Sequence, residues 1–519
     1  MTIPMFRILA ALMVAIPCAA GAATFTVTRG DDPVPDECAV DDCSLREAIA
    51  ATAATPEADT IVLGAGQYQV TIGPLGIQSA MTIRGAGSSA TRVVASGGDS
   101  LIYVGAFGNL TIEHLEAGSI DGDAIVVFDN AFATLRDIKV AGNAGGVGTA
   151  SDDNGTGAIR IEQSTIDSGV ACLQALGSCR MFDSRVHRII AQDAEIELQR
   201  VEVDGAGEPL VGIEVGGGKP ITIVDSTIRN ADLPLRLVGN GETADPVHIR
   251  RTRFLDNTGP LLADRIGAIF LDDVEFRHHV ISDDMLNLPA VLLAEAGPIW
   301  YFSNALVVGN RGGSTIDGAV FRILAGGRVF VDNSTFDDNT FRPDVGSSYG
   351  HTIGVYNNTS TPTLLFLVHV TMRRSLLLTD DTVGSLLTVR GPSTDVRVFN
   401  SVLHGTCGFG GGGTITAAMG NAESPGHGCN FDEADNFVDI LPSNLFLGSL
   451  GDHGGFTETF LPARSSMLID AANSGACQVF GTLDQRRYLR STDGSDCDIG
   501  SVEVNALSDA IFADAFEGA

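Results

Sequence analysis

The chain has 519 residues, of which 44% are hydrophobic and 62 are glycine, so it is neither disordered nor collagen-like. Its 32 basic residues are outnumbered by 64 acidic ones; the resulting net charge of −32 argues against nucleic acid or an anionic membrane as a partner. Charged residues make up only 18% of the chain while Gly, Thr, Ser, Val and Ile are plentiful, a mixture that favours short strands and tight turns over helices.

Residues 1–23 have the features of a signal peptide. Arg7 supplies the positive flank, residues 8–16 form an apolar run, and residues 20–23 provide the small side chains of a cleavage region. The apolar run is too short for a membrane anchor, and no later stretch reaches about 18 uninterrupted apolar residues. Cys18 leaves a lipoprotein signal open, although Pro17 fits a lipobox poorly. We therefore expect a secreted protein whose mature part has no integral membrane span.

Eight cysteines follow the signal region, an even number that suits disulfides in an oxidising compartment. The sequence does not fix their connectivity, but local pairing is favoured in a fold built from successive turns. The near-neighbour couples are Cys38 with Cys43, Cys172 with Cys179, Cys407 with Cys429, and Cys477 with Cys497. A zinc site is the alternative, and the absence of a CxxC pair and of a histidine at ligand spacing from two cysteines speaks against it.

Residues 24–58 are expected to form an N-terminal cap that contains one short helix. Ser44 and Glu47 have the spacing of a capping box at the start of this helix. Leu45 and Ile49 lie four residues apart, so they share one helix face that would cover the first part of the following fold.

The same segment carries a family resemblance. The stretch Cys43-Ser44-Leu45-Arg46-Glu47-Ala48-Ile49, preceded by Cys38 and by Phe25-Thr26-Val27-Thr28, closely resembles the CSLREA domain of secreted bacterial proteins. Those proteins commonly continue into right-handed parallel β-helix repeats. The resemblance therefore implies an exported protein with a β-helix after residue 58.

Residues 59–405 contain a repeated pattern with apolar residues at offsets 0, 2 and 7. The alternation within each copy is that of a β-strand, and the copies are about 26 residues apart on average. Thirteen copies begin at Met81, Leu110, Ala133, Ile159, Cys179, Ile196, Ile221, Val247, Ile269, Ile299, Val329, Leu365 and Val396. A further apolar stretch often precedes these anchors, which leaves no room for a crossover helix.

Equivalent strands that recur at this spacing predict coils stacked in parallel. The predicted fold is an all-β, right-handed parallel β-helix of about 13 coils. One or two β-sandwiches are the alternative, but they give no reason for thirteen copies of one pattern. Asparagines that tolerate left-handed backbone follow several anchor strands, and we expect them at corners: Asn143, Asn230, Asn257, Asn310 and Asn339.

Residues 406–505 resemble the choice-of-anchor Q domain. The matching stretches are Leu450-Gly451-Asp452-His453-Gly454-Gly455, Leu461-Pro462, Ile469-Asp470-Ala471, Asp484-Gln485-Arg486 and Cys497-Asp498-Ile499-Gly500-Ser501-Val502-Glu503. The pattern departs from the family at His453, Met467, Arg487 and Ser501. The resemblance implies a loop-rich C-terminal cap and placement at the bacterial cell surface. Residues 506–519 resemble a short tail of exported Gram-negative proteins.

Asp484, Arg486 and Asp498 are expected to stabilise this C-terminal cap. Carboxylates can accept backbone N–H groups in tight turns, and Arg486 can pair with one of them. We therefore interpret these residues as structural and assign no catalytic residue.

Adjacent acidic residues are the candidates for glycosidic-bond hydrolysis, which needs two carboxylates at a defined separation. They are Asp152-Asp153, Asp272-Asp273, Asp283-Asp284, Asp337-Asp338 and Asp380-Asp381. An acidic chain also produces such pairs on solvated turns. A lyase would need a base, and the stretch Arg250–Arg253 could form a charged patch with Asp272 and Asp273 on the following coil; ordinary ion pairing explains these residues equally well.

Three further features are weighed as ligand contacts. Trp300 is the single tryptophan; with Ile299 as anchor, Tyr301 points inward and Trp300 outward, so Trp300 is the candidate for ligand binding. His278-His279 is interpreted as an exposed loop. Gly426-His427-Gly428 matches one polygalacturonase motif, but the companion motifs are missing.

These observations lead to two main functional hypotheses. We expect an exported, non-enzymatic β-helix protein that binds an extracellular polysaccharide or a surface protein, as an adhesin does. The alternative is a polysaccharide lyase or glycoside hydrolase on the same scaffold, and a purely structural role is the third hypothesis. We expect no cofactor, although acidic turns leave Ca²⁺ open as a ligand.

Overall fold

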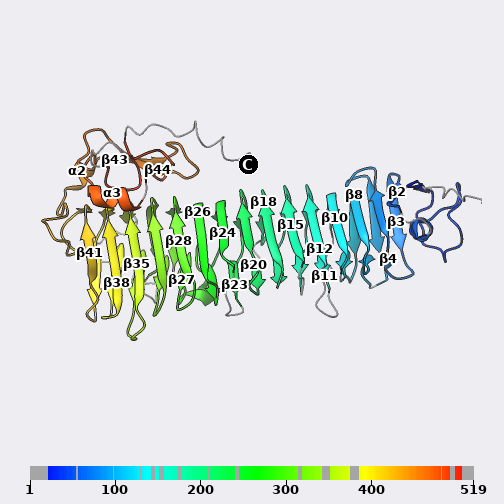
Figure 1. Cartoon of the computed structure of the whole chain (residues 1–519), viewed down its shortest axis with the longest axis horizontal. Helices are drawn as coiled ribbons and strands as arrows, with labels where there is room; N and C mark the ends of the chain where they lie inside the picture. The colour runs from blue at the N-terminus through cyan, green and yellow to red at the C-terminus, as the bar shows by residue number, and fades with distance from the viewer. Residues whose placement is uncertain are drawn as a thin grey trace, which may run out of the picture.

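The structure is a computed structural model that describes residues 21–53, 57–97, 99–128, 130–141, 146–150, 157–173, 177–206, 210–239, 245–313, 318–341, 351–374, 385–480, 482–490 and 497–504. The chain winds into a right-handed parallel β-helix, which forms one long rod (Figure 1). This architecture confirms the predicted solenoid. Residues 1–20 of the expected signal peptide, the tail at 506–519, Asn143 and the acidic pairs Asp152-Asp153 and Asp380-Asp381 lie outside the described residues.

The coils build three faces, and the first face is a ladder of parallel strands that pair in chain order. These strands are β2 (Asp59–Leu63), β5 (Ala80–Arg84), β8 (Asn109–Ser119), β10 (Phe132–Val140), β12 (Ala158–Glu162), β15 (Ser178–Phe182), β18 (Glu195–Gln199), β21 (Ile221–Val224), β24 (Val247–Leu255), β26 (Ala268–Arg277), β28 (Ile299–Ser303), β32 (Arg328–Asp332), β35 (Thr363–Val368), β38 (Thr394–Phe399) and β41 (Ile415–Met419). The thirteen predicted coils run from β5 to β38, and one further coil lies at each end.

The second face follows a bend in each coil. Its strands are the later parts of β8, β10, β24 and β26 together with β3 (Gly66–Val70), β6 (Thr91–Ala95), β13 (Thr165–Ile166), β16 (Arg185–Val186), β19 (Glu202–Asp204), β22 (Thr227–Arg229), β29 (Leu306–Val308), β33 (Thr335–Phe341), β36 (Thr371–Arg374), β39 (Val402–His404) and β42 (Ala422–Ser424). The short strand β30 (Arg311–Gly312) pairs with the end of β33.

The third face consists of a nine-stranded and a five-stranded parallel sheet. The first contains β4 (Leu75–Ile77), β7 (Ile102–Val104), β9 (Ile125–Val127), β11 (Val147–Thr149), β14 (Val170–Cys172), β17 (Ile189–Gln192), β20 (Val211–Gly216), β23 (Leu233–Val238) and β25 (Leu262–Asp264). The second contains β27 (Leu292–Ala294), β31 (Phe321–Ile323), β34 (Ile353–Tyr356), β37 (Leu387–Arg390) and β40 (Cys407–Gly410).

The predicted anchors form one buried column on the first face, with a single exception. Anchors in neighbouring coils pair directly from Met81 to Ile269 and again from Val329 to Val396. The anchor at Ile299 is wrong by one residue, because Trp300 pairs with Ile269 and Val329. The apolar run at 299–302 fits either phase, and a shift of one residue exchanges the two faces of a strand.

The bend between the first and second faces has the same backbone conformation in every coil from β8 to β38. The residue four positions after the anchor is left-handed, with φ between 44° and 58°. We call these residues the bend column: His114, Asp137, Gln163, Asp183, Arg200, Asp225, Arg251, Asp273, Asn304, Asn333, His369 and Asn400. Asp and Asn tolerate this conformation best among side-chain-bearing residues, which accounts for their frequency here.

A corner after the second face holds a ladder of buried polar side chains. Asn310 Nδ2 donates to Asn339 Oδ1 (2.9 Å), and both residues are buried, as is Asn257. His279 occupies the coil between Asn257 and Asn310; its backbone N–H donates to Asn310 Oδ1 (2.9 Å). Burial lowers the pKa of His279 to about 4. His279 is therefore a neutral structural ring, and the prediction of an exposed loop holds only for His278, whose side chain is 60% exposed.

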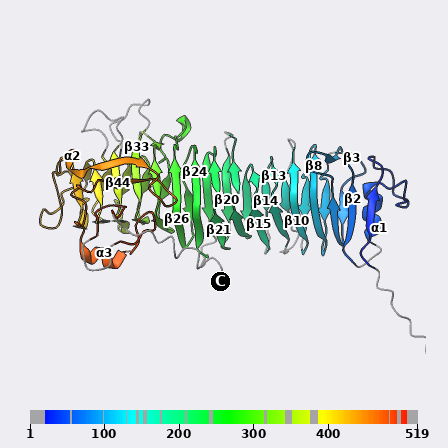
Figure 2. The ribbon, with the colours of Figure 1, turned by 90° about the horizontal axis from the view of Figure 1, so that it is seen from above.

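The N-terminal end is covered by β1 (Thr24–Val27), which pairs with β2, and by α1 (Leu45–Thr52). Figure 2 shows α1 across this end of the rod. The backbone N–H of Glu47 donates to Ser44 Oγ (3.3 Å), and that of Ser44 donates to the Glu47 carboxylate (2.7 Å), so the predicted capping box is present. Leu45 and Ile49 are buried in the core of the β-helix.

The C-terminal part folds back along the side of the rod. The β-helix continues through β42, past residue 405, and the chain then forms α2 (Pro442–Leu445), β43 (Leu447–Gly451), β44 (Thr459–Pro462) and α3 (Ser474–Phe480). Figures 1 and 2 show these elements beside the last coils. We call residues 442–504 the C-terminal region. The helices of the described residues are α1, α2, α3 and a 3-10 turn at Asp283–Met285, and none of them has the length and hydrophobicity needed to cross a bilayer.

Candidate functional site

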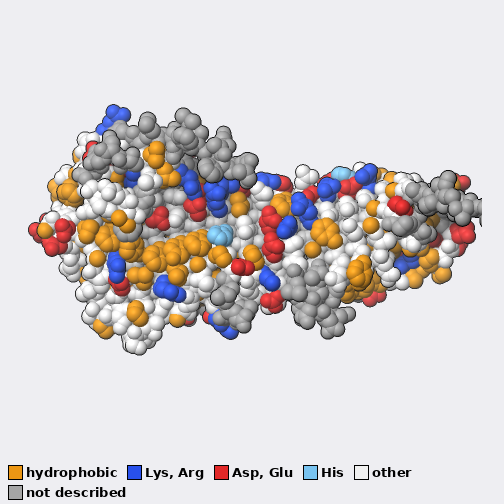
Figure 3. All heavy atoms as spheres, in the orientation of Figure 1, with side chains coloured by type: hydrophobic (Ala, Val, Ile, Leu, Met, Phe, Trp, Pro, Cys, Tyr) orange, Lys and Arg blue, Asp and Glu red, His pale blue; other side chains and the backbone are white. Residues whose placement is uncertain are grey.

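The outward side chains one position after the anchors change character along the rod. In the early coils this position is polar, beginning with Thr60, Thr82, Thr111 and Thr134. From β24 to β35 it carries rings, which we call the aromatic row: His248, Phe270, Tyr301, Phe330 and Phe366. Hydrophobic side chains accordingly gather in a band along the late coils of this face (Figure 3).

Rings of the aromatic row stack on one another along the rod. The centroids of Phe270 and Tyr301 are 4.8 Å apart, and those of Tyr301 and Phe330 are 5.0 Å apart, with interplanar angles of 6° and 17°. Phe366 continues the row at 5.9 Å from Phe330. Because each ring covers the face of its neighbour, the row presents ring edges to the solvent. Ring edges carry the positive part of the quadrupole and attract oxygen atoms.

Trp300 is absent from this surface, so the prediction that it contacts a ligand is wrong. Its side chain has no exposed area and lies in the core, where the neighbouring rings include Phe302. Tyr301 takes the outward position that the sequence analysis gives to Trp300. The correction follows directly from the one-residue error at Ile299.

A polar row runs beside the aromatic row, two positions further along each strand. It consists of Arg250, Asp272, Ser303 and Asp332, which pair in register across β24, β26, β28 and β32. Ser303 Oγ donates to Asp332 Oδ1 (2.7 Å), and the Arg250 guanidinium lies 3.6 Å from Asp272. A shallow hollow of about 380 Å³ lies at the two rows and is lined by His248, Ile249, Arg250, Phe270, Leu271, Asp272, Tyr301 and Ser303.

Two carboxyls next to residues that line the hollow have raised pKa values. Burial, assisted by the negative charge of Asp272, raises the pKa of Asp332 to about 6. Burial and the same neighbour also raise the pKa of Asp273, against the opposing effect of Arg487. Asp332 is thus partly protonated under mildly acidic conditions, a property that a general acid needs.

The C-terminal region borders the polar row and contributes Arg487 to it. Arg487 donates to Asp272 Oδ2 (2.5 Å) and to Asp273 Oδ2 (2.9 Å), and it does so from a left-handed backbone with φ of 66°. Asn304 Nδ2 donates to the other oxygen of Asp272 (3.0 Å). Asp272 is therefore fixed from both the β-helix and the C-terminal region.

The charged patch predicted around Asp272 and Asp273 forms only in part. Arg250 lies close to Asp272, as described above, but Arg251 pairs with Asp225 (2.5 Å). Arg253 pairs with Glu275 (3.1 Å) and stacks over the ring of Phe456, with its guanidinium carbon 4.6 Å from the centroid. The strand turns at the left-handed Arg251, so neighbouring arginines point to different sides.

The sequence candidates that remain within the described ranges do not join the polar row. Asp283 and Asp284 are exposed in the 3-10 turn. Asp337 pairs with Arg373 (2.7 Å), and Asp338 pairs with Arg311 (2.7 Å). His427 contacts the Phe431 carbonyl (2.7 Å) in the loop after the last coil.

All four near-neighbour cysteine couples form disulfides, as the spacing predicts. The bonds join Cys38 to Cys43, Cys172 to Cys179, Cys407 to Cys429, and Cys477 to Cys497. Cys429 is buried, and its backbone N–H donates to Glu423 Oε1 (2.7 Å), so its bond to Cys407 fastens the loop after β42 to β40.

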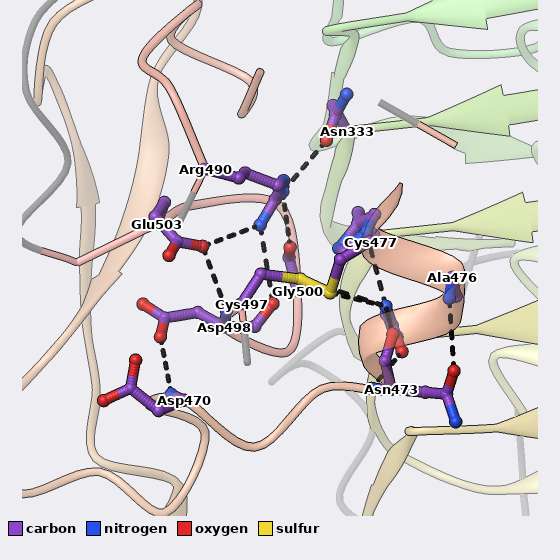
Figure 4. The surroundings of a disulfide bond; sticks show 12 residues. Asn333, Asp470, Asn473, Ala476, Cys477, Arg490, Cys497, Asp498, Gly500 and Glu503 are labelled. Atoms are coloured by element: carbon purple, nitrogen blue, oxygen red, sulfur yellow. Dashed lines mark hydrogen bonds and ion pairs between the residues drawn. A yellow bond between two sulfur atoms is a disulfide. The ribbon is translucent and has the colours of Figure 1, made fainter. Parts of the chain in front are cut away.

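The Cys477–Cys497 bond lies where the C-terminal region meets the β-helix (Figure 4). Together with His369 these two sulfurs form a group of potential metal ligands within 4.8 Å, but the disulfide occupies both of them. The possibility of bound Ca²⁺ remains a prediction.

The predicted cap residues of the C-terminal region have structural contacts. Arg486 donates to Asp484 Oδ2 (2.7 Å), and Asp484 also accepts backbone N–H groups, including that of Tyr488 (3.0 Å). Asp498 accepts the backbone N–H of Asp470 (2.8 Å). These contacts fit the interpretation of Asp484, Arg486 and Asp498 as turn-stabilising residues.

No protein-family model matches the chain, and no curated protein matches it. Among solved structures, the A-module of the mannuronan C-5 epimerase AlgE6 from Azotobacter vinelandii is 12% identical, with a TM-score of 0.34 over 77% of this chain and 97% of that chain. The catalytic unit of a GH87 α-1,3-glucanase from Streptomyces thermodiastaticus is 14% identical (TM-score 0.37, 78% and 69%). A PL6 alginate lyase in complex with a trisaccharide is 9% identical (TM-score 0.32, 85% and 92%). At these identities the likeness concerns the fold alone.

Proposed function

We propose that the chain is an exported protein that binds a polysaccharide on the late coils of the first face. The observation that carries this proposal is the aromatic row lying directly beside the polar row. Sugars present apolar C–H groups and hydroxyls side by side, so they suit a surface on which apolar ring edges adjoin carboxylate, hydroxyl and guanidinium groups. The rings repeat once per coil, at 4.8–5.9 Å, which allows several sugar units to be contacted in succession.

Stacking between coils is the competing explanation of the aromatic row, because these rings also stabilise the rod. A binding experiment separates the two roles. The purified chain should bind at least one member of a panel of neutral and uronate-rich polysaccharides, assayed with and without Ca²⁺ by affinity electrophoresis. Tyr301→Ala and Phe330→Ala should weaken this binding at least tenfold.

Thr111→Ala is the matched control, because it truncates the same outward position in the early, polar coils. It should leave binding unchanged. If no polysaccharide binds, or if the ring variants that remain folded bind as well as the wild type, the proposal fails. A melting curve for each variant distinguishes lost binding from lost folding.

Hydrolysis of a glycosidic bond is the second candidate function, and the raised pKa of Asp332 favours it. Asp272 and Asp332 lie on first-face strands separated only by β28, so their backbones are about 10 Å apart. This spacing is compatible with the carboxyl separation of roughly 6.5–9.5 Å in inverting glycosidases. Asp332 would protonate the leaving oxygen while Asp272 takes a proton from the water that attacks the anomeric carbon.

Binding ranks above hydrolysis because Asp272 is already engaged by Arg487 and Asn304, with Arg250 nearby. Release of reducing ends from a bound polysaccharide, abolished by Asp332→Asn and by Asp272→Asn, would establish hydrolysis. Unsaturated sugars among the products would indicate a lyase instead. Binding without release of any product would leave the protein a non-catalytic binder.

A further inference from the structure

The aromatic row ends at His248, on whose second face no further ring stacks among the described residues. The His248 ring stacks on Phe270, at 5.2 Å between centroids and 9° between planes, so its other face points toward the preceding coil. Its partner in that coil is Thr222 on β21, whose side chain is too short to continue the stack. His248 is exposed and Thr222 is half-buried. The row thus ends in a step with a flat ring on one side.

Polar groups surround this step. Arg250 lies two residues after His248, so it points outward from the same strand; its side chain is 49% exposed, and Asp272 at 3.6 Å is its partner. Beyond Thr222 the next coil carries Glu197, which is held by Arg180 (3.3 Å). The step therefore combines a ring face, a hydroxyl and a guanidinium group.

We propose that this step is a sugar subsite in which one pyranose ring stacks on the free face of His248, above Thr222, with its hydroxyls bound by Arg250. The inference rests on the proposed function and specifies where and how the polysaccharide is held. Stacked rings lie roughly perpendicular to the rod, so a pyranose in the step lies in the same plane.

The charges favour a neutral sugar. The carboxylates nearest the step, Glu197 and Asp272, are paired with Arg180 and Arg250, but the chain as a whole carries a net charge of −32, so a polymer of uronates is repelled on approach. An uncharged pyranose avoids this repulsion and still offers hydroxyls to Arg250. The expected ligand is therefore a neutral polysaccharide.

The experiment places an aromatic side chain in the step, where the sugar is proposed to bind. Thr222→Phe extends the aromatic row by one ring and covers the free face of His248. Titration calorimetry with cellohexaose, maltohexaose, mannohexaose and hexagalacturonate should show binding of at least one neutral oligosaccharide to the wild-type chain. For that oligosaccharide, Thr222→Phe and His248→Ala should each raise Kd at least tenfold, and His248→Phe should restore binding because it keeps a flat ring.

Thr111→Phe is the matched control, since it adds the same ring to the same outward position far from the step; it should bind like the wild type. If Thr222→Phe binds as well as or better than the wild type while Tyr301→Ala loses binding, the step is not a subsite but the proposed function stands. Tighter binding of hexagalacturonate than of every neutral hexaose overturns the inference. If no carbohydrate binds the wild-type chain, the proposed function itself fails.

Discussion

The bend column is exposed in the early coils and covered in the late coils. In the early coils its members contact one another at the surface: His114 Nδ1 lies 2.8 Å from Asp137 Oδ2, and Arg200 forms an ion pair with Asp183 (2.5 Å), with side chains 42–49% exposed. In the late coils the members contact the C-terminal region, and Asn333 is an example: its Oδ1 accepts a hydrogen bond from Arg490 (2.9 Å). One backbone position thus serves two different environments.

The composition of the column follows this change of environment. Charged side chains predominate where water is present, whereas Asn304, Asn333 and Asn400 occupy covered positions. A buried amide needs only hydrogen bonds, while a buried charge also needs a compensating partner. Asp273 is the covered exception, and Arg487 supplies that partner.

The aromatic row begins near the coil where the C-terminal region begins to cover the bend. Arg487 contacts β26, and the rings run from β24 to β35. The early coils therefore present polar side chains and surface ion pairs. The late coils present the aromatic row and the polar row beside the C-terminal region. Because of this difference we propose that the late coils carry the function, and three experiments test whether the early and late coils differ as described.

The largest difference is expected between a covered and an exposed arginine. Arg490 is almost fully buried and donates to Asn333 and to the Gly500 carbonyl (2.9 Å each), with Glu503 at 3.4 Å (Figure 4). Arg490→Ala leaves the buried Glu503 without this partner and should lower the free energy of unfolding by about 3–5 kcal/mol. Urea denaturation followed by circular dichroism measures the change.

Arg200→Ala is the matched variant in the early coils. Its ion pair with Asp183 is solvated, so the free energy of unfolding should fall by only a small fraction of the loss in Arg490→Ala. Similar losses for the two variants would show that the C-terminal region does not pack on the bend column as described.

The second experiment compares two disulfides. Cys477 and Cys497 are separated by 20 residues, so removing their bond should cost about 3 kcal/mol, and it should also free the C-terminal region to be cut by proteases. Cys172 and Cys179 are separated by 7 residues in the early coils. Removing their bond should cost about 2 kcal/mol and should not make the C-terminal region more susceptible to proteases. The double Cys→Ala variants are compared by urea denaturation and limited proteolysis. An identical cleavage pattern in both would contradict a specific role of Cys477–Cys497 in holding the C-terminal region.

The solenoid itself was predictable because its evidence is local and repeated. Because the alternation within a strand recurs in thirteen coils, a misassigned residue in one copy does not change the predicted fold. Which side chains of a single strand point inward is harder to predict. At residues 299–302 four consecutive apolar side chains allow either alternation. Only the neighbouring coils decide that Trp300 is buried and Tyr301 is outward.

The aromatic row left a trace in the sequence. The residue after each anchor from Val247 to Leu365, read with the corrected anchor at Trp300, is His248, Phe270, Tyr301, Phe330 and Phe366. Reading that column would have revealed the row. By contrast, Arg487 meets Asp272 across more than two hundred residues, and no pattern in a single sequence encodes such a docking contact. The polar row was therefore predicted only in part, as Arg250 beside Asp272 and without the contribution of Arg487.

The third experiment concerns the pH dependence of stability. The pKa of Asp332 rises from 3.8 to about 6 on folding, so the folded chain holds a proton that the unfolded chain releases between these values. The free energy of unfolding therefore falls as pH rises through this window, by up to about 3 kcal/mol. Asp332→Asn should remove this cost and stabilise the protein by about 1–3 kcal/mol at pH 8, with little effect near pH 3.5.

The contribution of Asp183, in the early coils, to the free energy of unfolding should rise with pH instead, because its hydrogen bond with Arg200 lowers its pKa. That contribution is present above the ordinary pKa of the carboxyl and is lost as the pH falls, so Asp183→Asn should destabilise slightly at pH 8. Melting temperatures of both variants at pH 3.5, 6 and 8 measure the two slopes. If Asp332→Asn were destabilising at pH 8, the Asp332 carboxyl would be ionised and well paired. It could then not serve as the proton donor of the second candidate function, and the late coils would differ from the early ones in packing alone.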